Sequence, residues 1–282
     1  MPEGDTIFRS ARTLERALAG STVIGFETAY APLASVHDNA PVTGRAIEKV
    51  ESRGKWMLMY FSGDLILVTH MLMSGSWHIY RRGERWRKSR AHMRIVIQTE
   101  KLEAVAFDVP VAQFHTHRSL ARHPAILRLG PDLAGGSFRH VVARSRLRAE
   151  AQEEIGNVLL NQRVLAGIGN VFKSEICFVC GINPFRTVAS LSDPELDMLL
   201  DASHRLMQAN VREESLGGIV TYTGPRRTTR ANDPAARLWV YRRKGTGCRR
   251  CGAIILMRKQ GPGARSTYWC PQCQPANAPT SA

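Results

Sequence analysis

Acidic residues are scarce in this chain, and long apolar runs are absent from it. The 282 residues include 24 Asp and Glu against 39 Lys and Arg, which gives a formal net charge of +15 at pH 7. A surplus of this size favours a polyanionic partner, most commonly nucleic acid. No stretch has the length and hydrophobicity of a membrane span or a secretory signal. We therefore expect a cytoplasmic protein of the bacterial type, with no membrane partner.

The positive charge is concentrated in two parts of the chain. Between Pro225 and Cys273, twelve basic residues accompany a single acid, Asp233. They are Arg226, Arg227, Arg230, Arg237, Arg242, Arg243, Lys244, Arg249, Arg250, Arg258, Lys259 and Arg265. A second cluster, from Arg81 to Arg94, contains seven basic residues and one acid. A solvated face is the alternative interpretation for both, and it is weaker for the first cluster because those residues surround a candidate metal module.

Cysteines are few, and four of the six form a pattern. Cys248-x2-Cys251 and Cys270-x2-Cys273 are separated by eighteen residues. Four thiolates in two close pairs suit a tetrahedral Zn2+ ion, with Zn–S distances of about 2.3 Å. Because the protein fills all four positions, we expect one structural zinc per chain. The expected compartment argues against disulfide bonds.

Two other pairs look like metal ligands but lack a second pair beside them. Cys177 and Cys180 spell C-x-x-C near the end of an apolar helix, and we interpret them as buried thiols. His115-x-His117 is an isolated pair in a loop and does not predict a metal site.

The chain begins Met1-Pro2-Glu3, which has a possible chemical meaning. Removal of the initiator methionine would leave Pro2 as a secondary-amine N-terminus, whose pKa lies near 8 and not near that of a lysine, so part of it is unprotonated at neutral pH. Attack on an aldehyde-level carbon would give an iminium that serves as an electron sink. Glu3 could move the protons. With Met1 retained, the same nitrogen would be an amide and inert.

The hydrophobic period changes along the chain and predicts helices and strands in separate regions. Residues 5–18 predict a helix, capped by Asp5 and ended by Gly20. The other expected elements are a β-hairpin at 56–61 and 65–69, strands at 76–80, 93–99 and 102–107, a connection at 123–139, and helices at 153–161, 170–180 and 192–213, the last opening with a capping box.

Five separate segments resemble the Fpg/Nei family of bifunctional DNA glycosylases, in the family's order. They are Pro2-Glu3-Gly4, Gly54-Lys55, His70-Met71-Leu72-Met73-Ser74-Gly75, Asn161–Asn170 and Arg265–Pro271. They are similar, in turn, to the catalytic N-terminus, the catalytic-domain lysine, a loop that inserts an apolar wedge into DNA, the turn of the helix–two-turn–helix motif, and the zinc-finger hairpin. The resemblance spans residues 2 to about 274.

The resemblance implies an α+β fold with two principal parts: an N-terminal β-sandwich with a leading helix, and a C-terminal helix–two-turn–helix domain that carries a zinc-finger β-hairpin. The implied boundaries are 1–125 for the catalytic domain, 126–150 for a linker, 151–240 for the DNA-binding domain, 241–274 for the zinc finger and 275–282 for a disordered tail.

The resemblance also implies a base-excision-repair glycosylase with AP lyase activity, acting as a monomer on damaged DNA, most simply duplex. Pro2 would attack C1′ of the flipped nucleotide, and Glu3 would be its acid/base partner. Lys55, His70, Asn170 and Arg265 would grip phosphates, with Arg265 as a bidentate clamp. Met73 would fill the gap in the base stack, with a core methionine as the alternative. Glu175 is a candidate for orienting the N-terminus.

Two branches of the family differ in substrate, and the chain shares features with both. Residues 2–6 resemble the endonuclease VIII-like branch, which favours oxidised pyrimidines, whereas Met73 is more similar to the purine branch. The purine branch also inserts an Arg and a Phe from a second loop, and the comparable stretch here, Asp108–Phe114, contains no arginine. Residues 223–233 are expected to form part of the damage pocket or a lid over it. We expect oxidised pyrimidines to be preferred.

Two other functions fit much of the same sequence. A non-catalytic zinc-ribbon protein that binds DNA would have the same basic clusters and cysteines, but it would not need Pro2. An AP lyase with little glycosylase activity would share every catalytic residue and differ only in its base pocket. Separate assays of base release and strand cleavage distinguish the three.

Overall fold

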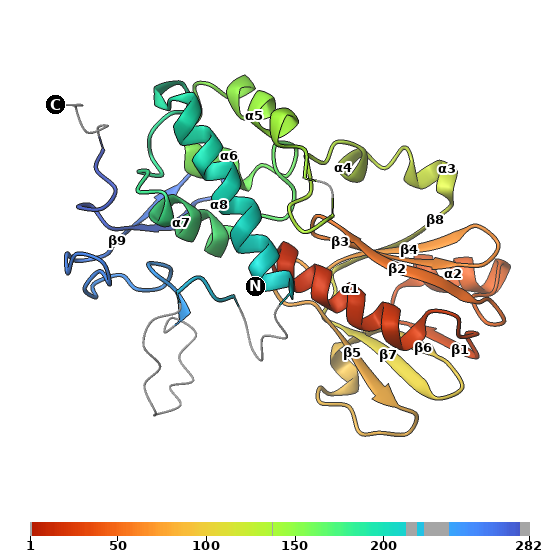
Figure 1. The fold of residues 1–282 in the computed structure, drawn as a ribbon. Helices are drawn as coiled ribbons and strands as arrows, with labels where there is room; N and C mark the ends of the chain where they lie inside the picture. The colour runs from red at the N-terminus through yellow and green to blue at the C-terminus, as the bar shows by residue number, and fades with distance from the viewer. Residues whose placement is uncertain (1, 137, 213–218, 223–236, 277–282) are drawn as a thin grey trace. The chain divides into compact units, whose positions relative to one another are not determined.

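The computed structural model describes residues 2–136, 138–212, 219–222 and 237–276. The chain divides into two compact units, Met1–Arg128 and Leu129–Ala282, called unit 1 and unit 2 below (Figure 1). Unit 1 is a β-sandwich with a leading helix, and unit 2 is helical with one β-hairpin, so the predicted α+β class is confirmed. None of the helices in these described ranges is long and apolar enough to cross a membrane.

Unit 1 contains two four-stranded antiparallel sheets. The strand orders are β1-β6-β7-β5 and β2-β3-β4-β8. The strands are β1 (Gly25–Thr28), β2 (Ile47–Arg53), β3 (Trp56–Phe61), β4 (Leu65–His70), β5 (Ser76–Arg81), β6 (Met93–Gln98), β7 (Leu102–Phe107) and β8 (Val111–His115). The predicted hairpin is confirmed as β3–β4, and β5, β6 and β7 lie where strands were expected.

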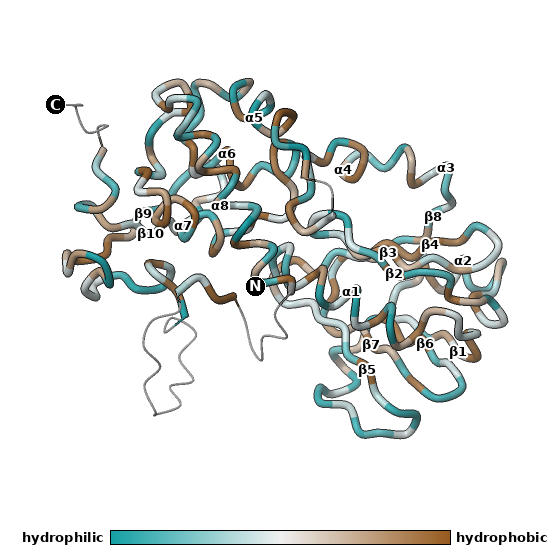
Figure 2. The backbone as a smooth tube through the Cα atoms, viewed as in Figure 1, coloured by the Kyte–Doolittle hydropathy of each residue, from teal (hydrophilic) through white to brown (hydrophobic). Residues whose placement is uncertain are grey.

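Three strands of unit 1 were not predicted, because their sequences do not alternate. In β2 the register shifts between Ile47 and Lys49, which breaks the two-residue period of a strand. β1 has only four residues, and β8 follows Pro110 with mixed polar and apolar side chains. Figure 2 shows the contrast: β3 and β4 are strongly hydrophobic, whereas the loop after β5 is hydrophilic.

The leading helix α1 (Gly4–Leu18) covers the core of unit 1 with one apolar face. The side chains on that face are at most 2% exposed: Ile7, Ala11, Leu14 and Leu18. They belong to one cluster with inward-facing residues of β3, β4, β6 and β7. The predicted end of the helix is confirmed, since the C-cap is Ala19 and Gly20 has φ +81.

Asp5 is not the cap of α1, and that prediction is wrong. The N-cap position is occupied by Glu3, whose side chain makes no capping bond, and the helix begins at Gly4. Asp5 lies in the first turn, where it is fully buried and 3.0 Å from the guanidinium of Arg9. The polar type of Asp5 suggested a cap, but the fold buries this carboxylate beside a basic partner one turn later.

The remaining elements of unit 1 are short. They are α2 (Ala31–Asn39), the 3-10 turn η1 (Arg90–His92), α3 (His117–Leu120) and α4 (Pro124–Leu127). Both α3 and α4 have a side-chain cap, from Thr116 and His123 respectively.

The described residues of unit 2 form four α-helices and the hairpin. The helices are α5 (His140–Ala149), α6 (Ile155–Leu160), α7 (Asn170–Val179) and α8 (Asp193–Arg212), with a 3-10 turn η2 at Val188–Ser190. α8 opens with the predicted capping box, in which Glu195 accepts from Ser192 N at 2.7 Å. α5 lies inside the stretch 126–150 that was expected to be a linker. Of the expected disordered tail, 277–282 lies outside the described residues.

The turn between α6 and α7 is organised by one side chain. Gln162 donates from Nε2 to the carbonyls of Leu160 and Ile168, and its Oε1 accepts from Gly167 N at 3.0 Å. Gly167 has φ +106, a conformation that favours glycine. The Gln and Gly of this segment therefore fix where the next helix begins, at Asn170.

The hairpin of unit 2 consists of β9 (Leu256–Gln260) and β10 (Arg265–Trp269). The strands are antiparallel, and Arg265 pairs with Gln260 at the end next to the turn. Two of the candidate zinc ligands precede this hairpin, and two follow it.

Candidate active site and zinc finger

The four cysteines Cys248, Cys251, Cys270 and Cys273 converge on one point of unit 2. Their sulfur atoms all lie within 4.8 Å of one another, with 3.9 Å between Cys248 and Cys273 and 3.4 Å between Cys251 and Cys270. Tetrahedral Zn–S bonds of about 2.3 Å require S···S separations of about 3.8 Å. The arrangement fits one structural zinc ion, as predicted from the spacing.

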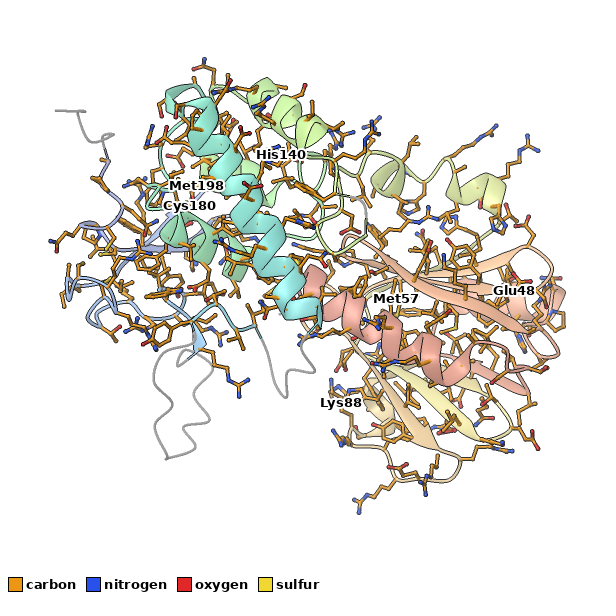
Figure 3. The ribbon with its side chains drawn as sticks, viewed as in Figure 1. Glu48, Met57, Lys88, His140, Cys180 and Met198 are labelled. Atoms are coloured by element: carbon orange, nitrogen blue, oxygen red, sulfur yellow. The ribbon has the colours of Figure 1, made fainter. Side chains whose placement is uncertain are left out.

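The other C-x-x-C pair is not part of any such cluster. Burial raises the pKa of both Cys177 and Cys180 to about 12, so neither thiol is reactive at neutral pH. Cys180 contacts the carbonyl of Met198 on α8, and the two residues lie side by side in Figure 3. The interpretation as buried thiols is confirmed for Cys177, whereas Cys180 is only partly buried.

The histidine pair also has local partners. His117 Nδ1 is 2.5 Å from Asp64, and His115 contacts Ser119 and Gln113. Within the described ranges, only the four cysteines form a group suited to a metal.

The N-terminus of unit 1 combines an amine with two buried acids. Pro2 is half-buried, while Glu3 and Asp5 are both 0% exposed. Burial raises the pKa of Asp5, and the nearby Arg9 partly offsets that effect. Carboxylates are rarely buried fully unless they are paired or have a function. The start of α1 is thus an acidic site beside the candidate nucleophile.

Lys55 and His70 lie close together in unit 1. Lys55 follows Gly54 in the turn between β2 and β3, and His70 ends β4 opposite Trp56. Burial and the charge of Lys55 lower the pKa of His70 to about 4, so the ring is neutral at physiological pH. Its Nδ1 accepts from Leu72 N at 3.1 Å, which leaves the proton on Nε2. His70 can therefore donate one hydrogen bond to a phosphate without carrying a charge.

The wedge loop, residues 71–75, presents two apolar side chains to solvent. Met73 is 59% exposed, which excludes the alternative of a core methionine, and Leu72 is 49% exposed. Leu72 also has φ +45, a strained conformation for a leucine. Gly75 closes the loop, because a Cβ there would lie 2.7 Å from the carbonyl oxygen of Met71. The sequence analysis missed Leu72, although an apolar residue beside Met73 in a turn was a usable signal.

The stretch comparable to the second intercalating loop of the purine branch is Asp108–Phe114, which contains no arginine. Residues 111–115 form strand β8, paired with β4. Phe114 packs against the core of unit 1, with its ring centroid 5.7 Å from that of Phe26. The stretch therefore offers neither an arginine nor a phenylalanine free to enter DNA.

In unit 2, the start of α7 lies against the hairpin. Asn170 is 7% exposed and donates from Nδ2 to the carbonyl of Ser266 at 2.8 Å. Arg265, exposed and adjacent to Ser266, begins β10. The two phosphate contacts predicted for unit 2 thus come together although they are far apart in the sequence. A helix N-terminus and a guanidinium both favour an anion.

Two buried charges of α7 were not understood from the sequence. Glu175 accepts four hydrogen bonds within unit 2, from Thr221 Oγ1 and from the backbone N–H groups of Trp239, Val240 and Tyr241. It therefore anchors residues 221 and 239–241, and these contacts do not support the role of orienting the N-terminus. Lys173 is 0% exposed and donates to Thr267 Oγ1 at 2.5 Å. A lysine inside an otherwise apolar helix was the signal for it.

The basic clusters are only partly available to a polyanion. Among the described residues of unit 2, four arginine side chains lie over aromatic rings: Arg258 over Phe185 at 3.7 Å, Arg249 over Tyr222 at 4.1 Å, Arg250 over Phe178 at 4.7 Å and Arg242 over Tyr241 at 5.9 Å. In unit 1, Lys88 pairs with Asp108 and Arg90 with Glu27. Arg226, Arg227 and Arg230, with the rest of 223–233, lie outside the described residues.

Three segments of the chain match known domain families. Residues 1–118 match the formamidopyrimidine-DNA glycosylase N-terminal domain, and residues 129–221 match the formamidopyrimidine-DNA glycosylase H2TH domain. Residues 248–276 match the zinc finger found in FPG and IleRS.

Curated relatives match the chain over nearly its whole length. A probable endonuclease 8 2 of Streptomyces coelicolor is 37% identical, with 99% of this chain and 96% of the relative covered. A DNA-(apurinic or apyrimidinic site) lyase Nei2 of Mycolicibacterium smegmatis is 35% identical over 98% of this chain and 100% of the relative. Endonuclease 8 of Escherichia coli is 30% identical over 97% and 100%.

Solved structures share the fold. A complex of the Lactococcus lactis Fpg with DNA containing an abasic site aligns with a TM-score of 0.79 at 24% identity, covering 97% of this chain and 99% of that chain. MutM in complex with DNA containing carbocyclic 8-oxo-G aligns with a TM-score of 0.81 at 23% identity, covering 97% and 100%. From its three domains and its full-length relatives, we conclude that the chain belongs to the Fpg/Nei family of bifunctional DNA glycosylases.

Proposed function

We propose that this protein excises oxidised bases, with pyrimidines preferred, and then cuts the strand by β,δ-elimination through Pro2. Family membership provides the glycosylase and AP lyase activities of base excision repair. The preference for pyrimidines rests on one observation: the stretch comparable to the second loop that the purine branch inserts ends here in a strand whose phenylalanine packs against the core. The likeness of residues 2–6 to the endonuclease VIII-like branch supports the same choice.

The proposed chemistry begins at Pro2, with Met1 removed. Its nitrogen forms a bond to C1′ of the flipped nucleotide as the bond from C1′ to the base breaks. Glu3, buried beside it, donates a proton to the sugar ring oxygen as that ring opens, which leaves a cationic iminium. The iminium acidifies the 2′ proton, and loss of that proton expels the 3′ phosphate. A second elimination then expels the 5′ phosphate.

The remaining residues hold the DNA. Lys55 and neutral His70 contact phosphate from unit 1, while the start of α7, with Asn170, and Arg265 contact phosphate from unit 2. Met73 enters the stack where the base has left. The zinc ion, when bound, holds the segments on both sides of the hairpin and takes no part in the reaction. We place the enzyme in the cytoplasm as a monomer on damaged duplex DNA, where reduced thiolates can keep the metal.

Borohydride trapping on two duplexes tests the proposal. One duplex carries an abasic site and the other an oxidised pyrimidine, and the matched variant has a glutamine inserted between Met1 and Pro2, so that the proline nitrogen is an amide. Adducts on both duplexes that map to Pro2, and that vanish in the variant, support the proposal. An adduct only on the abasic duplex indicates a lyase. No adduct, despite DNA binding and a processed N-terminus, indicates a non-catalytic DNA-binding protein.

A further inference from the structure

A continuous chain of hydrogen bonds, buried except at its Glu154 end, connects α7 to both strands of the zinc-finger hairpin. Lys173 donates to Thr267 Oγ1 at 2.5 Å, and the Thr267 hydroxyl donates to Gln260 Oε1 at 2.7 Å. Gln260 Nε2 then donates to Glu154 Oε2 and to the carbonyl of Pro184, both at 2.8 Å. Lys173 and Thr267 are 0% exposed, and Gln260 is 5% exposed.

Every bond in this chain points the same way. A cation donates at one end, a carboxylate accepts at the other, and the hydroxyl and the amide between them each accept once and donate onward. Such an arrangement fixes the orientation of each group, and aligned bonds strengthen one another in a low-dielectric interior. The fit is tight as well, because a Cβ on Gly156 would lie 2.5 Å from Gln260 Oε1. The chain can therefore hold the hairpin in one position relative to α6 and α7.

The chain meets the hairpin at the end that carries Arg265. Gln260 is the cross-strand partner of Arg265, and Thr267 is two residues further along β10, on the same face of the strand. Ser266 lies between Arg265 and Thr267, and its carbonyl accepts a hydrogen bond from Asn170. Tyr268 follows Thr267, and its backbone N contacts Ser174 at 3.4 Å. From Ser266 to Tyr268, consecutive residues of β10 are each bonded to α7, and Arg265 extends from this fixed segment.

We propose that Lys173, Thr267 and Gln260 are positioning residues for DNA capture: they hold Arg265 where it can clamp the phosphate at the lesion. This inference rests on the proposed function of Arg265. A buried ammonium is costly to place in a protein interior, and replacing a buried ionic group by apolar residues of similar size is often neutral or stabilising. The chain is therefore better explained by the geometry that it imposes on the hairpin than by a gain in stability.

The test uses a duplex with an uncleavable abasic-site analogue, so that binding is measured independently of Pro2 chemistry. Thr267→Val removes the hydroxyl at nearly constant size and should weaken binding about tenfold or more, as expected when a charge-assisted phosphate contact is lost. Thr267→Ser keeps the hydroxyl and should bind like the unmodified protein. Ser203→Ala is the matched control, because it removes another fully buried hydroxyl of unit 2, bonded to Leu199 on α8.

Thr267→Val leaves a buried lysine without this acceptor and could prevent folding, so a second variant is needed. Lys173→Met combined with Thr267→Val replaces the charged pair by apolar groups and should recover thermal stability without recovering DNA affinity. Adding Arg265→Ala to this double variant should then change affinity little, whereas in the unmodified protein it should cost about tenfold or more. An additive loss, or full affinity in the folded double variant, overturns the inference.

Failure of this inference is distinguishable from failure of the proposed function. If Arg265→Ala has no effect in the unmodified protein, the proposed role of Arg265 is wrong. If Arg265→Ala weakens binding but the Thr267 and Lys173 variants do not, only the positioning role is wrong. Zinc content should equal one ion per chain in every variant that is compared.

Discussion

The two helices that begin at candidate site residues, α1 and α7, carry opposite charge at their starts. α1 is preceded by Pro2 and starts with two fully buried acids, Glu3 and Asp5. α7 has no acid in its first turn, and Lys173 is buried within it. Both helix starts attract anions through their backbone dipoles, but the side chains cancel this effect in α1 and add to it in α7.

This difference matches the two tasks of the enzyme. An iminium is cationic and is stabilised beside carboxylates, whereas a phosphate is anionic and is stabilised at a positive helix start. In the proposed function, the same secondary-structure feature serves chemistry in unit 1 and substrate capture in unit 2. Side-chain charge, and not the helix itself, separates the two roles.

The largest expected effect comes from removing the acid beside the nucleophile. Glu3→Gln keeps the size and polarity of the side chain but removes its acid/base function, so strand cleavage should slow by about two to four orders of magnitude. DNA affinity should remain unchanged. Single-turnover kinetics at saturating enzyme, together with binding to an uncleavable duplex, measure both. A loss of affinity with normal single-turnover rates would place Glu3 in DNA binding instead.

Placing a carboxylate at the start of α7, as at the start of α1, should weaken DNA binding and leave the cleavage chemistry unchanged. Asn170→Asp places a carboxylate where a phosphate is expected and should weaken affinity about thirtyfold, equivalent to about 2 kcal/mol. Asn170→Ala is the control, and it should lose less because it adds no repulsion. The cleavage rate at saturating DNA should stay close to normal for both. Equal DNA affinity of the two variants would show that no phosphate binds at this site.

Removing zinc should weaken DNA binding but leave the reaction at Pro2 intact. Loss of the metal frees the segments on both sides of the hairpin, so Arg265 is no longer held, and affinity should fall about tenfold. Saturating DNA should restore most of the trapping at Pro2. After verified chelation, titration with DNA gives both the affinity and the yield of borohydride trapping at saturating DNA. Unchanged affinity in the metal-free protein would show that zinc is not needed to hold Arg265 in position.

The smallest effect concerns pH and the histidine of unit 1. The folded-state pKa of His70 is about 4, below the value of about 6.5 for a free histidine. Stability from this group is therefore complete above pH 6.5 and is lost as the pH falls from there toward 4. His70→Asn should flatten part of that loss, as measured by chemical denaturation between pH 4 and 7. The same slope in both proteins would show that other groups cause it.

Most of the site residues that the sequence predicts have local signals. Pro2 is marked by its position and the four cysteines by their spacing, whereas Met73 was implied by the resemblance of residues 70–75 to the wedge loop. The domain boundaries were implied by resemblance, and the elements inside them followed from hydrophobic period. β2 and β8 were not predicted, because a register shift in β2 and the proline before β8 break that period.

Leu72 was missed despite a local signal, whereas the contacts of the buried charges of α7 depend on distant parts of the chain. Lys173 and Thr267 are 94 positions apart, and Glu175 and Tyr241 are 66 apart. Neither pairing leaves a mark in the local sequence beyond a charge in an apolar helix. Asp5 was misread for the same reason, since its burial is set by the packing of α1 and not by its own neighbours in the chain.

The left-handed backbone at Leu72 lowers the stability of the fold, while its side chain adds to the apolar surface of the wedge loop. Holding a leucine at φ +45 costs about 1 kcal/mol, a cost that glycine would not incur. Leu72→Gly should therefore raise the melting temperature of unit 1 while removing one of the two apolar side chains that the wedge loop exposes. A search for more heat-stable forms of this enzyme would tend to select glycine there, and it would select weaker repair at the same time.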